Sequence, residues 1–98
     1  MSAPRLYLDN AATSFPKPAC VHEAMVHYMT RVGGTAGRGT YAEAREGARV
    51  IATCRQRICE FIHGENPDHV VFTLNTSDAL NLAINGVVAQ RRLDSPGR

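Results

Sequence analysis

The sequence is poor in lysine and in long apolar runs, and each shortage excludes a class of protein. Lys17 is the one lysine beside ten arginines, and the net charge is only +2. A charge this small, with no basic stripe interleaved with aromatic residues, gives no support for a nucleic-acid-binding surface. No apolar run approaches the roughly 20 residues of a membrane span, and the N-terminus lacks a signal-peptide pattern. We therefore expect a cytoplasmic protein that binds neither membranes nor nucleic acid.

Cysteine and histidine are present, but neither is arranged for a disulfide framework or a metal site. The three cysteines, Cys20, Cys54 and Cys59, are odd in number and form no CxxC pair. We interpret them as reduced thiols. His22 and His27 are five residues apart on one expected helix, which does not place them on one face. Because no cluster has metal-ligand spacing, the sequence predicts no metal.

What is present is an ordinary globular composition with a helical pattern and one short strand. The chain has 98 residues, of which 44% are hydrophobic and 20% are charged, enough for one small domain with a limited core. Apolar residues at helical spacing and strand-forming residues between turn signals together predict an incomplete α/β fold. The expected elements are helices at about 18–31, 41–62 and 77–88, and a strand at about 70–73.

The expected strand leads through a polar turn directly into the third helix. Asn75, Thr76 and Ser77 form this turn, and all three are small or capping residues. The start of a helix offers free backbone N–H groups and a positive dipole end, and two adjacent hydroxyls add donors for a phosphate. The alternative interpretation, to which we give about equal weight on these residues alone, is that they only cap the helix.

A glycine-rich connection at 33–39 separates the first two expected helices and carries Arg38. It is either a loop that approaches a ligand or a partner subunit, with Arg38 projecting, or a flexible linker with a solvated arginine. These two interpretations stay open. The connection does not have the GxGxxG pattern that follows a strand, so it implies no dinucleotide.

Two separate motifs resemble one enzyme family. Tyr7-Leu8-Asp9-Asn10-Ala11-Ala12-Thr13-Ser14, followed by Pro16-Lys17-Pro18, is similar to the opening of class V aminotransferases of the cysteine desulfurase type. The stretch from Phe72-Thr73 through Thr76-Ser77-Asp78-Ala79-Leu80-Asn81 resembles the phosphate-binding segment of that family. Gly37-Arg38-Gly39 before a long helix is also similar. Because two motifs occur in the right order at the right separation, the resemblance is specific over about 6–86.

The resemblance implies a fold-type-I enzyme that depends on pyridoxal 5'-phosphate, forms homodimers and acts on an amino acid, cysteine being the expected substrate. It assigns the cofactor phosphate to Asn75, Thr76 and Ser77. It places the backbone of Ala11, Ala12 and Thr13 near the substrate, and Arg38 near the active site of the partner subunit. This chain departs from the family where Asn75 replaces a frequent glycine and Tyr41 replaces a frequent histidine.

The resemblance also implies that the catalytic residues are absent from this chain. The family's cofactor-binding lysine lies much later in its sequence, and Lys17, between two prolines, does not match it. None of the three cysteines matches the nucleophile that accepts sulfur. We therefore expect residues 1–88 to be the N-terminal part of such an enzyme, inactive alone, and residues 89–98 to be an atypical, disordered polar tail. A truncated or frameshifted reading frame is one hypothesis for this tail, and a deliberately cut domain is the other. The alternative is a non-catalytic phosphate- or partner-binding remnant that associates with a full-length relative.

The isolated chain is expected to be marginally stable or to self-associate. A single strand leaves its backbone groups unpaired, and amphipathic helices without the rest of a sheet expose their apolar stripes. Size-exclusion chromatography with light scattering, followed by thermal unfolding, measures both properties. A monomer with a sharp, cooperative transition would contradict this expectation.

Overall fold

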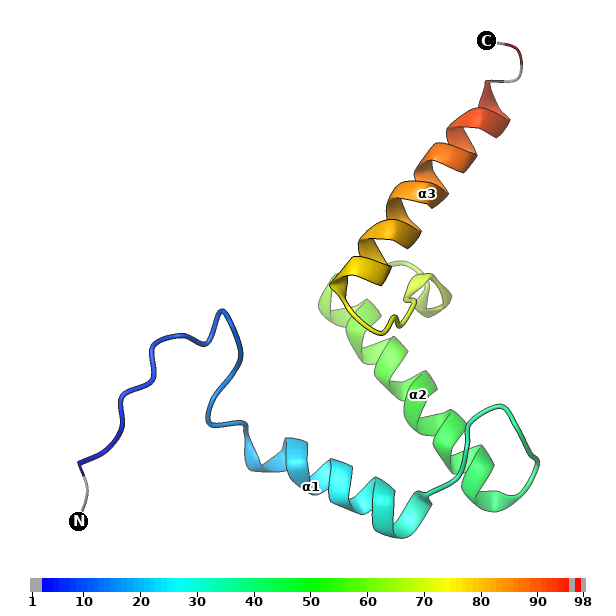
Figure 1. Ribbon diagram of the computed structural model, residues 1–98. Coiled ribbons are helices and arrows are strands. Elements are labelled where there is room, and N and C mark those ends of the chain that lie inside the picture. The colour runs from blue at the N-terminus through cyan, green and yellow to red at the C-terminus, as the bar shows by residue number, and fades with distance from the viewer. Residues whose placement is uncertain (1–2, 96, 98) are drawn as a thin grey trace. The chain divides into compact units, whose positions relative to one another are not determined.

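The structure is a computed structural model that describes residues 3–95 and 97, and these residues form helices and turns but no strand (Figure 1). The chain divides into two compact units, residues 1–53 and 54–98, and the boundary between them falls within the helix that spans residues 42–61. The elements in order are α1 (Ala19–His27), the π-helical turn η1 (Tyr28–Val32), α2 (Ala42–Phe61), the 3₁₀ turn η2 (Pro67–His69) and α3 (Thr76–Asp94).

The first helical stretch begins after a proline and ends at a glycine. Pro18 precedes α1 with a φ of −54°, a value that its ring favours at the start of a helix. Gly33 follows η1 in the left-handed conformation, with a φ of 60°, and its N–H donates to the carbonyl of Tyr28 at 2.8 Å. The helical stretch 19–32 therefore agrees closely with the expected helix at 18–31.

Close backbone contacts join the glycine-rich connection to the start of α2. The hydroxyl of Tyr28 donates to the carbonyl of Gly34 at 2.7 Å. A Cβ atom on Gly34 would collide with the backbone carbonyl of Glu43 and would lie 2.7 Å from the nitrogen of Ala44. A Cβ atom on Gly47 would lie 2.9 Å from the Tyr28 hydroxyl and 3.0 Å from the Gly34 carbonyl oxygen. Gly34 therefore has no room for a side chain, and a side chain at Gly47 would displace the Tyr28 hydroxyl.

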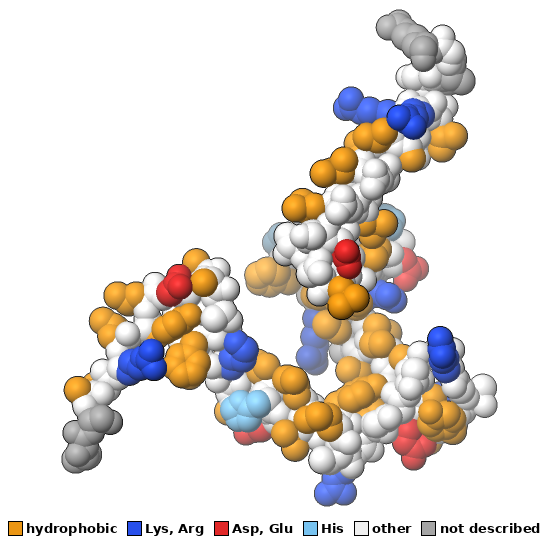
Figure 2. Space-filling view, viewed as in Figure 1, with side chains coloured by type: hydrophobic (Ala, Val, Ile, Leu, Met, Phe, Trp, Pro, Cys, Tyr) orange, Lys and Arg blue, Asp and Glu red, His pale blue; other side chains and the backbone are white. Residues whose placement is uncertain are grey.

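The buried core is small, and the apolar stripes of the helices are exposed. Among the described residues, the buried hydrophobic side chains are Val32, Ala44 and Cys59. Met25 on α1 is 61% exposed and Ile84 on α3 is 60% exposed, although both lie on the apolar faces of their helices. Figure 2 shows apolar side chains along the surface of α3. The expectation of exposed stripes is confirmed for α1 and α3, whereas Ala44 on α2 is buried.

The strand expected at 70–73 does not form, and the α/β class is not confirmed for the described residues. Val70 has extended backbone, with φ −83° and ψ 115°, but residues 70–73 pair with no neighbouring strand in the described chain. The N–H of Val70 donates to the carbonyl of Pro67 at 3.0 Å, and its carbonyl accepts from the side chain of Arg55. A strand requires a second strand for its ladder, which explains the difference.

The third helix is longer than expected, because it ends at Asp94 and not near 88. Residues 89–94, which we expected in a polar tail, therefore belong to α3. The amide of Gln90 donates to the carboxylate of Asp94 at 2.9 Å across one turn. Arg91 and Arg92 lie in the last turn, where positive charge stabilises the helix dipole. Residues 96 and 98 of the expected tail lie outside the described residues.

Gly34→Ala is expected to destabilise the unit of residues 1–53 by about 1–3 kcal/mol, because the added methyl group meets backbone atoms that cannot yield without moving α2. Urea unfolding followed by circular dichroism at low protein concentration measures the change. Gly86→Ala is the control, because nothing lies within 4 Å of its added Cβ atom and alanine raises helix stability by about 1 kcal/mol. Equal stability of Gly34→Ala and the unmodified chain would show that the close contact is not formed.

Candidate functional site

Asn75 ends the polar turn and caps α3. Its backbone is extended, with φ −160° and ψ 177°, and its side-chain Oδ1 accepts from the N–H of Asp78 at 2.9 Å. Its carbonyl accepts from the N–H of Ala79 at 3.1 Å and from the hydroxyl of Thr73 at 3.0 Å. The sequence predicted a helix cap within residues 75–77, and the structure assigns the cap to Asn75.

Thr76 and Ser77 are the first two residues of α3, and both are exposed. Within residues 3–95, neither backbone N–H meets a hydrogen-bond acceptor. The two oxygens of Asn75 accept instead from the N–H groups of Asp78 and Ala79. Their hydroxyls also have no hydrogen-bond partner among the described residues. Two amides and two hydroxyls at the positive end of a helix are the donors that a phosphate group requires, so these residues fit such a group chemically.

The segment that contains Ala11, Ala12 and Thr13 is a turn held by its own hydrogen bonds. The N–H of Ala12 donates to the carbonyl of Asp9 at 3.1 Å. The hydroxyl of Tyr7 donates to the carbonyl of Thr13 at 2.8 Å. These residues, like Arg38, belong to the unit of residues 1–53, whereas Asn75, Thr76 and Ser77 belong to the other unit. The three candidates for phosphate binding are consecutive residues at the start of α3, whereas the other predicted site residues belong to the unit of residues 1–53.

Lys17 stabilises the same turn. Its ammonium group donates to the carbonyl of Ser14 at 2.8 Å and lies 3.5 Å from the hydroxyl oxygen of Thr13. The side chain is exposed. A lysine that forms a covalent link with a carbonyl compound requires a free, partly desolvated amine. Lys17 has the surroundings of a structural residue.

Arg38 lies in the exposed loop between η1 and α2. The preceding Gly37 has a φ of 81°, a conformation that other residues rarely adopt. Arg38 itself is exposed and makes no hydrogen bond or ion pair with the described residues. The guanidinium group is therefore available to a ligand or a second chain, and both interpretations of the loop stay open.

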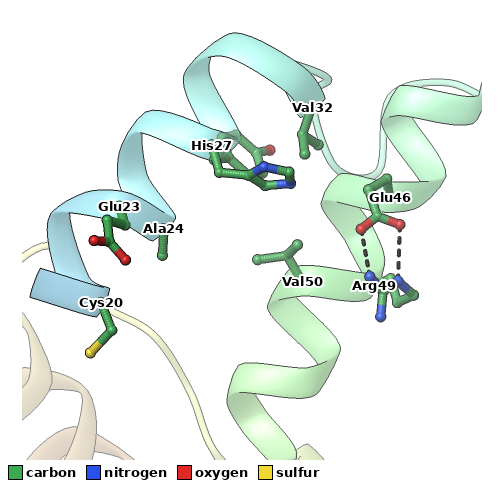
Figure 3. Close-up of a pocket in the computed structure, with 9 residues that line it drawn as sticks. Cys20, Glu23, Ala24, His27, Val32, Glu46, Arg49 and Val50 are labelled. Atoms are coloured by element: carbon green, nitrogen blue, oxygen red, sulfur yellow. Dashed lines mark hydrogen bonds and ion pairs between the residues drawn. The ribbon is translucent and has the colours of Figure 1, made fainter.

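A cavity of about 470 Å³ lies within the unit of residues 1–53, between α1–η1 and the first half of α2 (Figure 3). His27 points from α1 toward α2, where Arg49 Nε donates to a carboxylate oxygen of Glu46 at 2.9 Å. This hydrogen bond holds the pKa of Glu46 below its ordinary value, and the nearby His27 contributes a smaller effect in the same direction. The lining residues are Cys20, Glu23, Ala24, His27, Tyr28, Val32, Glu46, Arg49 and Val50.

Arg55 is the site-related residue that sequence reasoning missed. Its Nε donates to the carbonyl of Val70 at 3.1 Å, and its guanidinium carbon lies 5.4 Å from the ring centre of Phe72. The sequence contained a signal, because Arg55 interrupts the apolar spacing of α2 between Ile51 and Ile58. An arginine on an apolar face buries its stem along that face and leaves its guanidinium group free to reach an acceptor or an aromatic ring.

The described residues hold no group of three or more histidine, cysteine or acidic side chains placed to bind a metal ion. In the same residues, no helix combines the length and the apolar character that crossing a membrane requires. Cys20, Cys54 and Cys59 are free thiols, and Cys59 alone among them is buried.

Comparison with known proteins agrees on one family. Residues 6–95 match the family model described as aminotransferase class-V. A probable cysteine desulfurase from Streptomyces coelicolor is 40% identical over 80 residues, and one from Treponema pallidum is 39% identical over 83 residues. A third, from Methanothermobacter thermautotrophicus, is 35% identical over 82 residues.

These matches cover most of this chain but little of each relative. They include 82% of this chain and 19% of the Streptomyces protein, and 84% of this chain and 20% of each of the other two. The chain thus spans about a fifth of the length of the curated relatives it matches. No solved structure matches the chain significantly.

Asn75→Ala is expected to fray the first turn of α3 and to cost about 1 kcal/mol, because Asp78 loses the acceptor for its N–H. Hydrogen exchange of the Asp78 amide, measured by NMR, reports this loss. Asn66→Ala is a matched control: Asn66 Oδ1 accepts from the N–H of Asp68 at 2.9 Å, but it caps only the short turn η2. Unchanged exchange at Asp78 in Asn75→Ala would contradict the assigned cap.

Proposed function

The chain belongs to the aminotransferase class-V family, and from this premise we propose that it is the phosphate-binding N-terminal part of a cysteine desulfurase that uses pyridoxal 5'-phosphate. The curated relatives named as probable cysteine desulfurases support the choice of activity within the family. We further propose that the complete protein is a cytoplasmic homodimer that acts on cysteine.

The observation that carries this proposal is the unused donor set at the start of α3. The N–H groups and hydroxyls of Thr76 and Ser77 have no acceptor within residues 3–95. A phosphate has enough acceptor oxygens for all of them and carries the negative charge that a helix N-terminus stabilises. Asn75 holds the turn in place by capping, so its contribution is to orient the donors.

The proposed reaction of the complete protein removes sulfur from cysteine. The carbon–sulfur bond of the substrate breaks, the sulfur passes to an enzyme thiolate as a persulfide, and alanine is the other product. When bound, pyridoxal phosphate supplies the electron sink that makes this bond labile. The residues of this chain would bind the phosphate through Thr76 and Ser77, while the turn at Ala11, Ala12 and Thr13 would border the substrate.

We propose that this chain alone is inactive. Its one lysine, Lys17, is exposed and donates to the carbonyl of Ser14, so it lacks the surroundings of a covalent cofactor anchor. About 80% of each curated relative has no counterpart in these 98 residues. We assign the covalent lysine and the sulfur-accepting cysteine to that part of the enzyme.

A second candidate function is association with a full-length relative without catalysis. The exposed apolar side chains of α3, among them Ile84 and Val87, favour it, because such a face requires a covering partner. This candidate keeps phosphate binding but assigns no chemistry to the chain. Retention of a tagged chain by a purified full-length cysteine desulfurase would support it, and failure to bind would exclude it.

When the purified chain is mixed with pyridoxal phosphate, we expect weak binding that inorganic phosphate displaces, and no release of sulfide from cysteine. The reason is that the phosphate donors are present whereas a suitable amine is absent. Absorbance spectra before and after borohydride reduction, together with sulfide and alanine assays, measure the outcome. Lys17→Arg is the control and should bind equally well, because it keeps the charge.

Two results would contradict parts of this proposal. A borohydride-stable link to Lys17 in a chain that releases sulfide from cysteine would overturn the proposed inactivity. If neither pyridoxal phosphate nor inorganic phosphate altered the NMR signals of the Thr76 and Ser77 amides, the assignment of the phosphate site would be wrong.

A further inference from the structure

We infer that Arg55 is a positioning residue, which fixes the segment 70–75 and thereby the direction in which the first amides of α3 point. The part of α2 from residue 54 onward, the segment 70–75 and α3 all belong to the unit of residues 54–98. The effect of Arg55 on phosphate binding rests on the proposed function, whereas its effect on the geometry of α3 does not.

The segment 70–75 has little structure of its own. It is neither helix nor strand, and its side chains at Val71, Phe72 and Leu74 are exposed. Its internal hydrogen bond is that from the Thr73 hydroxyl to the carbonyl of Asn75. Backbone without ladder partners is free to change its dihedral angles, so an external contact is required to hold it.

Arg55 supplies such a contact with two different groups of the segment. Its Nε donates to the carbonyl of Val70 at 3.1 Å, across 15 residues of sequence, and this bond is partly buried. Its guanidinium plane also approaches the ring of Phe72, with 5.4 Å between the guanidinium carbon and the ring centre. The two contacted residues, Val70 and Phe72, lie two positions apart. Two contact points together restrict rotation of the segment that a single contact would allow.

The held segment ends at the cap of α3. Three residues separate Phe72 from Thr76, and the cap at Asn75 is already bonded to Asp78 within the helix. A change of backbone direction at Val70 or Phe72 would therefore turn the whole first helical turn with its free N–H groups. Arg55 acts on the phosphate donors through this segment and does not itself contact them in the structure.

The planar fork of arginine is required for this task. Lysine carries the same charge, but it has no Nε–H fixed beside a flat cation and stacks less well on an aromatic ring. Arg55→Lys therefore removes the geometry and keeps the charge. Arg57→Lys is the matched control, because Arg57 lies on the same helix, is exposed, and makes no hydrogen bond or ion pair with the described residues.

The experiment titrates inorganic phosphate into the full 98-residue chain and follows the backbone amides of Thr76 and Ser77 by NMR. Arg55→Lys is expected to raise the dissociation constant about threefold to tenfold, the effect of losing one or two weak polar contacts. Arg57→Lys is expected to leave it unchanged. Circular dichroism is recorded for each variant, and equal helix content is expected.

Each remaining outcome overturns the inference or separates it from the proposed function. Equal phosphate affinity in Arg55→Lys and the unmodified chain would overturn it, and so would a general loss of helix content in Arg55→Lys alone. If the unmodified chain binds no phosphate, the proposed function fails. The phosphate-free amide shifts of Thr76 and Ser77 then decide: displacement in Arg55→Lys but not in Arg57→Lys supports the positioning role, and identical shifts overturn it.

Discussion

The start of a helix has more amide donors than one capping side chain can satisfy, and the candidate site depends on this imbalance. Asn75 provides acceptors for the N–H groups of Asp78 and Ala79. The N–H groups of Thr76 and Ser77 meet no acceptor in residues 3–95. Water satisfies such groups at an exposed helix end, but an anion also gains from the helix dipole. The cap therefore stabilises α3 and leaves the N–H groups of Thr76 and Ser77 free at the place where we propose that a phosphate binds.

Within the part of the chain that the structure describes, the apolar faces of α1 and α3 are largely uncovered. Met25 and Ile84 are more than half exposed, and the buried hydrophobic side chains among the described residues are few and small. In the unit of residues 1–53, Gly34 instead lies against the backbone of Glu43 and Ala44, and Gly47 lies close to the Gly34 carbonyl oxygen. Such contacts determine the path of the chain locally, but they bury little apolar area and so contribute little hydrophobic stabilisation.

Local signals predicted the boundaries of the first helix best, and non-local partners explain the missing strand and the missed role of Arg55. Pro18 and Gly33 bound the first helix, and each acts through its own dihedral preferences. The strand expected at 70–73 depended on a neighbouring strand, about which propensity carries no information. The extension of α3 to Asp94 rests on side-chain contacts within the helix. Arg55 was missed because its acceptor lies 15 residues away in sequence.

Binding a phosphate and holding a cofactor covalently are separate tasks that require different surroundings. The exposed amides of Thr76 and Ser77 have the surroundings that the first task requires, since a helix N-terminus offers donors to an anion in water-accessible space. The second requires an amine that is kept out of water and free of competing acceptors. Lys17 fails both conditions, because it is exposed and donates to the carbonyl of Ser14. The proposed phosphate binding and the proposed lack of a covalent cofactor anchor therefore rest on different residues, and experiments can test them separately.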